Sequence, residues 1–153
     1  MDRARIAPYA QQGLFGLIDG LNGAVGLVIG LLHSHAGAQL VFVALLSRAG
    51  SSAVSMAGAE YEADDAVPMT RKVKSGRIAA MGLGYLTSAL LPGLGFAVST
   101  RAGLIVFIPA TAAILCAITW FRSQKAGWLK AGATTFTIFA LAVAAGLAAS
   151  LIG

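Results

Sequence analysis

The run Gly16-Leu17-Ile18-Asp19-Gly20-Leu21 places a carboxylate inside the first long apolar segment of the chain. An acid at membrane depth costs about 2.5–3.5 kcal/mol on insertion scales unless another group compensates its charge. A second charged residue, Arg48, lies near the middle of the next apolar segment. Because intramembrane charges are expensive, Asp19 and Arg48 are the first candidates for functional residues.

Composition places the chain among membrane proteins. It has 153 residues, of which 58% are hydrophobic and 11% are charged, whereas soluble domains average about 25% charged residues. The length suits one domain, and the single cysteine, Cys116, rules out an internal disulfide. No small-residue cleavage pattern follows the segment that holds Asp19, so we expect a retained membrane span there instead of a signal peptide.

We expect an all-α fold with five transmembrane helices. Five apolar segments each approach the ~20 residues that cross a bilayer. The backbone must satisfy its own hydrogen bonds in lipid, which favours helices. Pro92 and Pro109 fall inside two of the segments and predict kinks. The predicted spans form a single domain over 1–153 and cover residues 12–32, 37–60, 77–98, 102–121 and 132–152.

The basic residues predict the orientation. Cytosolic loops of membrane proteins carry an excess of Lys and Arg. Of the eleven basic residues, Arg101 lies on one side of the membrane, Arg48 lies within a span, and the other nine share the opposite side. The N-terminus is therefore expected in the cytosol and the C-terminus outside, in the inner membrane of a prokaryotic cell. The nine residues are Arg3, Arg5, Arg71, Lys72, Lys74, Arg77, Arg122, Lys125 and Lys130.

Glycines recur at steps of three and four residues along the first span. Such a stripe lets helix backbones approach closely. Asp19 lies beside it and shares a helix face with Gly16 and Gly23. The stripe either packs against a neighbouring helix of the same subunit or forms the seam of a homodimer, and a homodimer is the assembly we expect. Its members are Gly13, Gly16, Gly20, Gly23, Gly26 and Gly30.

The second span has a stripe of its own, since Arg48, Ser52, Met56 and Glu60 recur every four residues. A rise of ~1.5 Å per residue lets Met56 meet Asp19 at one depth, with Arg48 roughly 12 Å further outward. A carboxylate and a thioether together suit a soft-to-borderline divalent transition metal better than Mg²⁺ or Ca²⁺. The alternative for Met56 is a filler of the hydrophobic core.

Three short stretches resemble elements of the vacuolar iron transporter family. Gly16 to Leu21 is similar to its glycine-x-x-Asp-Gly-Leu element, Ala53 to Tyr61 to its Ser-Met-x-x-Gly-Glu-Tyr stretch, and Leu90 to Gly93 to its proline-bearing element. The resemblance implies a homodimer whose pore lies on the two-fold axis and is lined by the first helices. It also implies that divalent iron or manganese leaves the cytosol, often against protons, with Asp19 and Met56 as translocation ligands.

The sequence also departs from that family. Gln11 and Gln12 stand where the family usually has Arg-Asp, and Arg48 stands where it often has Glu. The long, Glu-rich cytosolic domain that many members carry between the second and third helices is replaced by a short loop. A permanent cation repels a divalent ion at short range. Arg48 therefore either offsets the charge of Asp19 as an ion pair or acts as a charge barrier.

Four acids gather where the second span reaches the cytosol: Glu60, Glu62, Asp64 and Asp65. Glu60 is a third candidate metal ligand beside Asp19 and Met56. The other three are candidates for recruiting cations to the mouth of the pathway. The alternative is a solvated helix end, which is how such a run of charge usually behaves.

The leading interpretation is a transporter that exports Fe²⁺ or Mn²⁺ from the cytosol, with protons as the candidate counter-ion. The metal is cargo, and no resident cofactor is expected. One alternative is a relative that has lost transport and serves as a structural or interaction subunit. Another is a carrier of a different solute, such as an anion, which Arg48 would favour.

Two other classes of function find no support in the sequence. An enzyme is disfavoured because no serine, histidine and acid constellation and no phosphate-cradling loop appears. Nucleic-acid binding is disfavoured because no basic face with stacking aromatics exists. The partners expected are therefore the lipid bilayer, a second copy of the chain and divalent metal ions.

Overall fold

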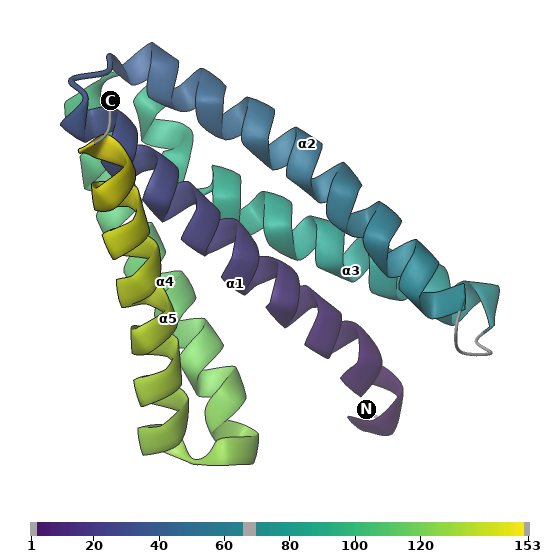
Figure 1. Cartoon of the computed structure of the whole chain (residues 1–153). Helices are drawn as coiled ribbons and strands as arrows, with labels where there is room; N and C mark the ends of the chain where they lie inside the picture. Colours follow the sequence, from purple (N-terminus) through teal and green to yellow (C-terminus); the bar gives the residue numbers. More distant parts are fainter. Residues whose placement is uncertain (1–2, 66–69, 152–153) are drawn as a thin grey trace.

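The fold is all-helical where the structure describes it. The computed structural model describes residues 3–65 and 70–151, and these contain five α-helices, one short 3-10 helix and no strand (Figure 1). The helices are α1 (Arg3–His33), α2 (Ala38–Asp65), α3 (Arg71–Leu90), η1 (Pro92–Ala97), α4 (Thr100–Ala126) and α5 (Trp128–Ser150).

Four helices of the described ranges are long and apolar enough to cross a membrane. They are the segments Tyr9–His33, Ala38–Glu62, Thr100–Gln124 and Trp128–Ala149 of α1, α2, α4 and α5. They agree with the first, second, fourth and fifth predicted spans. The chain is therefore an all-α, multi-pass membrane protein.

The third predicted span, 77–98, is divided. α3 ends at Leu90, and the backbone N–H of Leu91 donates the last bond, to the carbonyl oxygen of Thr87. Pro92 has no N–H with which to continue the α-helical ladder, and it opens the 3-10 helix η1 instead. The kink expected at this proline is therefore a break, and α3 is not among the four apolar helices.

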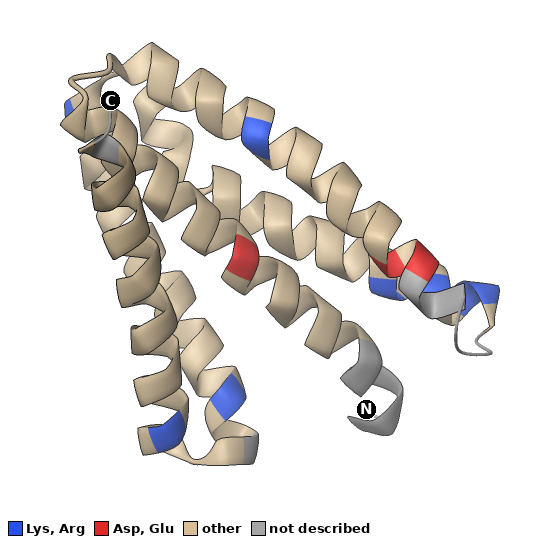
Figure 2. Ribbon diagram, in the orientation of Figure 1, with Lys and Arg blue, Asp and Glu red and all other residues tan. Residues whose placement is uncertain are grey.

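α1 is the central helix and contacts α2, α3, α4 and α5. In Figure 1, α3 runs in the same direction as α1 and α2 runs against both, while α4 and α5 form a hairpin that diverges from them. In Figure 1 the α1–α2 turn lies at the upper left beside the last turn of α5, whereas the far end of α2 lies at the lower right and the α4–α5 connection lies at the bottom. Figure 2 shows most of the basic residues that it colours near the far end of α2, the start of α3 and the α4–α5 connection.

The first half of the glycine stripe packs against α3. A Cβ at Gly16 would lie 2.9 Å from the backbone nitrogen of Tyr85, and one at Gly20 would lie 2.5 Å from the carbonyl oxygen of the same residue. Both distances are too short for a side chain, so only glycine allows this approach. Packing within one subunit is thus confirmed at these two positions, and a second subunit has no access to them.

The hydrophobic core holds one side of α1 in place. Leu21, Val25 and Val28 are buried there and belong to one cluster with Leu45 of α2 and Tyr85 of α3. Phe96 of η1 and Phe107 of α4 extend this cluster, with an edge-to-face contact between ring centroids 6.1 Å apart. The core fixes the rotation of α1 about its axis, and it leaves the face with Asp19 uncovered.

Candidate functional site

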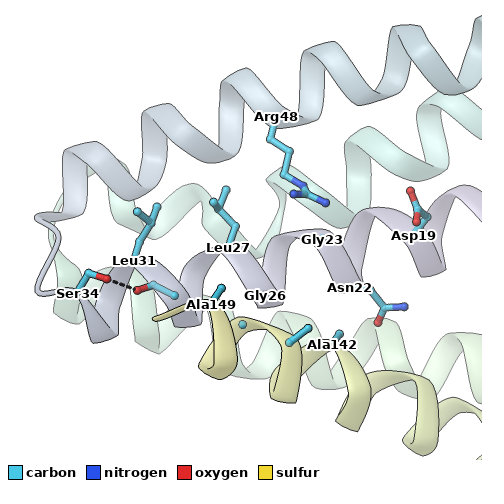
Figure 3. A pocket seen from close by; sticks show the side chains of 13 residues that line it. Asp19, Asn22, Gly23, Gly26, Leu27, Leu31, Ser34, Arg48, Ala142 and Ala149 are labelled. Carbon is cyan, nitrogen blue, oxygen red and sulfur yellow. Dashed lines mark hydrogen bonds between the residues drawn. The ribbon is translucent and has the colours of Figure 1, made fainter. Parts of the chain in front are cut away.

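A groove of about 580 Å³ runs along the uncovered face of α1, between α2 and α5 (Figure 3). Small residues make up most of its walls, so it is wide for a space between helices. α1 contributes Gly23, Gly26 and Gly30, and α5 contributes Ala142, Ala145 and Gly146.

α5 crosses α1 at two glycines beside the groove. A Cβ at Gly146 would lie 2.7 Å from the carbonyl oxygen of Gly26, so the two backbones touch at that point. The sequence interpretation missed α5 as a wall of the site. The available signal was the spacing of small residues at Ala142, Ala145, Gly146 and Ala149, which places them on one helix face.

Asp19 and Arg48 are the two charged side chains that line this groove among the described residues. Asp19 is exposed and lies near the middle of α1. The described part of the chain gives its carboxylate no hydrogen bond and no ion pair. An uncompensated acid in the middle of a membrane helix therefore faces an open space.

Arg48 reaches into the same groove from α2, and its guanidinium lies over Gly23 (Figure 3). A Cβ at Gly23 would lie 2.5 Å from Nη2 and 2.8 Å from Nε of Arg48. The missing side chain at this position therefore makes room for the guanidinium. Gly23 thus accommodates the side chain of Arg48, whereas Gly16 allows the backbone of α3 to approach α1.

The two opposite charges do not touch. No nitrogen of Arg48 lies within 4.0 Å of a carboxylate oxygen of Asp19. Asp19 lies one helical turn before Gly23, the position that the guanidinium covers. The groove consequently contains an acid and a base at neighbouring levels, each open to a ligand or to water.

Met56 is not among the residues that line the groove. It is partly buried and packs against the hydrophobic core. The reason is the rotation of α2, because Ala49 and Ala53 are buried and Met56 follows Ala53 by three residues, on the same face. The core-filler interpretation describes this position, and a metal-ligand role for Met56 stays a prediction.

Glu60 joins α2 to α3 instead of lining the groove. Its Oε1 accepts hydrogen bonds from Nη2 and Nε of Arg77, at 2.7 and 3.0 Å. Its side chain is buried, and that of Arg77 is 18% exposed. Nearby, Nζ of Lys74 lies 3.6 Å from the ring centroid of Tyr61. These contacts hold the α2–α3 hairpin together, so Glu60 has a structural partner already.

The acid cluster at the end of α2 is only partly described. Glu62 is exposed, while the side chains of Asp64 and Asp65 lie outside the described part of the chain. Within that part, no group of three or more His, Cys, Asp or Glu residues is placed to hold a metal ion. Cation recruitment by these acids stays a prediction.

Comparisons with known proteins identify no relative, since no family model, no curated protein and no solved structure matches the chain. The resemblance to vacuolar iron transporters therefore rests on the short stretches around Asp19, Met56 and Pro92. The fold and the site define a multi-pass helical membrane protein with a charged groove between three of its helices.

Proposed function

We propose that this protein carries a divalent transition-metal cation out of the cytosol, and that Asp19 is the residue that binds it in transit. The observation that carries the proposal is the carboxylate of Asp19, which faces the groove without a protein partner among the described residues. An acid at this depth needs a cation or a proton to offset its cost. Alternate occupation by the two would couple metal export to proton entry.

The donor atoms beside Asp19 favour manganese over iron as the cargo. Carboxylate, carbonyl and water oxygens suit Mn²⁺, whereas thioether sulfur selects softer metals. Asn22 lines the groove and offers an amide oxygen, while Met56 packs in the core. The motif around Asp19 supports iron or manganese in general, and the side-chain oxygens of Asp19 and Asn22 favour Mn²⁺ of the two.

A second copy of the chain would complete the pathway. The groove opens on one side of the molecule, so an isolated subunit would present Asp19 to hydrocarbon. Two copies related by a two-fold axis would place their grooves face to face and enclose a pore that holds both carboxylates. In this arrangement five segments cross the membrane, with α3 and η1 together as the third, and the N-terminus is cytosolic.

Arg48 acts in this proposal as a charge barrier on the outward side of Asp19. Its guanidinium lies at the level of Gly23, one turn beyond the carboxylate in the direction of export. A cation at that place repels a divalent ion through Coulomb forces that strengthen in a low-dielectric pore. The barrier would slow release and prevent a steady leak of metal.

Flux into proteoliposomes tests the proposal. Purified protein is reconstituted in either orientation in the liposome membrane, and uptake of Mn²⁺, Fe²⁺, Co²⁺ and Mg²⁺ is measured. The rates are compared with those of liposomes without protein. We expect Mn²⁺ to move faster than Fe²⁺, which is the order that the oxygen donors of Asp19 and Asn22 favour. No flux of any metal, with protein that unfolds cooperatively on heating, would contradict the proposal.

Two observations favour a second candidate, a structural or interaction subunit without transport. Arg48 brings a cation into the groove, and Met56 is directed to the core instead of to Asp19. In that case the parent protein moves neither metals nor anions in the same liposomes. Chloride or phosphate flux without metal flux would instead identify an anion carrier that uses Arg48.

A further inference from the structure

A second groove, of about 830 Å³, lies between α1, α4 and α5 and shares no lining residue with the groove of Asp19. Its lining is almost entirely apolar. Three aromatic residues on its rim, Trp120, Trp128 and Phe136, are 56%, 62% and 71% exposed. Exposed apolar patches mark sites of interaction with another protein or with a membrane. For a protein that crosses the membrane, the molecules around such a patch are lipids.

Basic residues follow both tryptophans of the groove in the sequence, and one of them, Arg122, lines a small adjoining pocket that shares Leu115 and Thr135 with it. Arg122 and Lys130 follow the two tryptophans by two residues each, and Lys125 lies between them in the sequence. No Asp or Glu occurs after Asp65, so the last 88 residues contain no acid side chain. The structure gives Arg122 and Lys130 no ion pair within its described residues. Figure 2 shows basic residues of α4 and α5 near the end where the two helices connect, and a further basic residue of α4 near its opposite end.

We propose that this groove binds one anionic phospholipid, with an acyl chain along α4 and α5 and the phosphate headgroup at Arg122 and Lys130. Tryptophans prefer the level of the membrane interface, which places Trp120 and Trp128 beneath a headgroup. Basic pockets between membrane helices attract anionic headgroups. The proposal does not depend on metal transport, because the lining of this groove has no residue in common with that of the Asp19 groove.

A second copy of the chain is a poorer occupant. Two grooves pressed face to face would bring Arg122 and Lys130 of one copy near the same residues of the other. Like charges at short range repel, and no acid of α3, α4 or α5 is there to offset them. A phosphate group on a flexible acyl chain satisfies both the apolar walls and the positive rim.

The two tryptophans provide a direct readout. They are the only two in the chain, and both line this groove. The whole protein is placed in phosphatidylcholine bilayers that contain a small fraction of lipid brominated on its acyl chains. We expect brominated phosphatidylglycerol to quench tryptophan fluorescence well beyond brominated phosphatidylcholine of the same chain length. Equal quenching by both lipids would overturn the proposal.

A charge variant tests the headgroup site. Arg122→Gln with Lys130→Gln should lower the relative affinity for phosphatidylglycerol about fivefold for each cation removed. Arg101→Gln is the matched control, since Arg101 is an exposed arginine at the other end of α4. A loss in the control as large as that in the double variant would show a general surface effect and overturn the site.

A packing variant tests the acyl-chain site and leaves every charge in place. Ala112 is exposed and lines the groove, whereas its neighbour Ala113 is exposed and does not line it. Ala112→Phe should reduce quenching by brominated phosphatidylglycerol at least threefold, and Ala113→Phe should leave it unchanged. Equal effects of the two variants, or no effect of Ala112→Phe in folded protein, would overturn the groove as the binding place.

Discussion

Arg48 of α2 occupies the space that Gly23 of α1 leaves empty, with Nη2 of the arginine 2.5 Å from the position of a Cβ at residue 23. The same glycine stripe meets backbone atoms of α3 at Gly16. One stripe therefore serves two purposes, which are close helix packing in its first half and room for a charged side chain further along.

Alanine substitutions separate these two purposes. Gly16→Ala forces a methyl group against backbone atoms of Met81 and Tyr85 and should cost about 1–3 kcal/mol of stability or more, as overpacking does. Gly23→Ala meets only the far end of a flexible arginine, so it should change stability little. Thermal unfolding in detergent measures both, and a larger loss for Gly23→Ala would contradict the packing described.

Arg48→Ala should leave the thermal stability nearly unchanged. Breaking a buried ion pair from one side typically costs about 3–5 kcal/mol, but Asp19 and Arg48 form no such pair here. A thermal double-mutant cycle of Arg48→Ala and Asp19→Asn should therefore be additive within about 0.5 kcal/mol.

The same arginine should limit transport if it is a barrier. Arg48→Glu places an acid on the outward side of Asp19 and should raise Mn²⁺ flux severalfold, because it replaces repulsion with attraction. Arg48→Gln, which is neutral, should give an intermediate rate. An unchanged rate in Arg48→Glu would argue against the barrier.

Glu60→Gln should destabilise the α2–α3 hairpin. It removes the carboxylate charge that Arg77 contacts at 2.7 Å, and hydrogen bonds to charged groups contribute about 1.5–3 kcal/mol. Glu62→Gln is the control, since Glu62 is an exposed acid of the same helix. If Glu60 is a metal ligand instead, its variant loses flux while its unfolding temperature stays that of the parent.

Cross-linking tests the proposed dimer face. Ala145 lines the groove of Asp19, and its exposed neighbour Ala144 does not. In a Cys116→Ser background, Ala145→Cys should form a covalent dimer with a short thiol cross-linker in liposomes, and Ala144→Cys should not. Efficient cross-linking at Ala144 alone would place the dimer interface on another face.

The sequence predicted the helices well and their breaks less well. Long apolar runs mark α1, α2, α4 and α5 because a membrane helix must be apolar over its whole length. Pro92 predicted a disturbance in the third segment. The observed form of this disturbance is a 3-10 helix after Leu90, and it depends on the packing of η1 against α4 and α2. The local sequence carries no information about that packing.

The candidate site was predictable in part. Asp19 and Arg48 stood out as charges in apolar surroundings, and the structure places both in one groove. The pairing of Asp19 with Met56 rested on depth and on the family resemblance, and neither fixes how a helix is rotated. In α2, small residues such as Ala49 and Ala53 decide which face turns to the core. In a helix that is apolar all round, periodicity carries little information about that choice.

The initial rate of Mn²⁺ uptake in proteoliposomes, compared between the parent, Asp19→Asn and Asn22→Ala, tests the central claim most directly. Asp19 supplies the only acid in the groove among the described residues, so its neutral isostere should lower the rate at least a hundredfold, while Asn22→Ala should retain a measurable rate. A rate in Asp19→Asn equal to that of the parent would contradict the account.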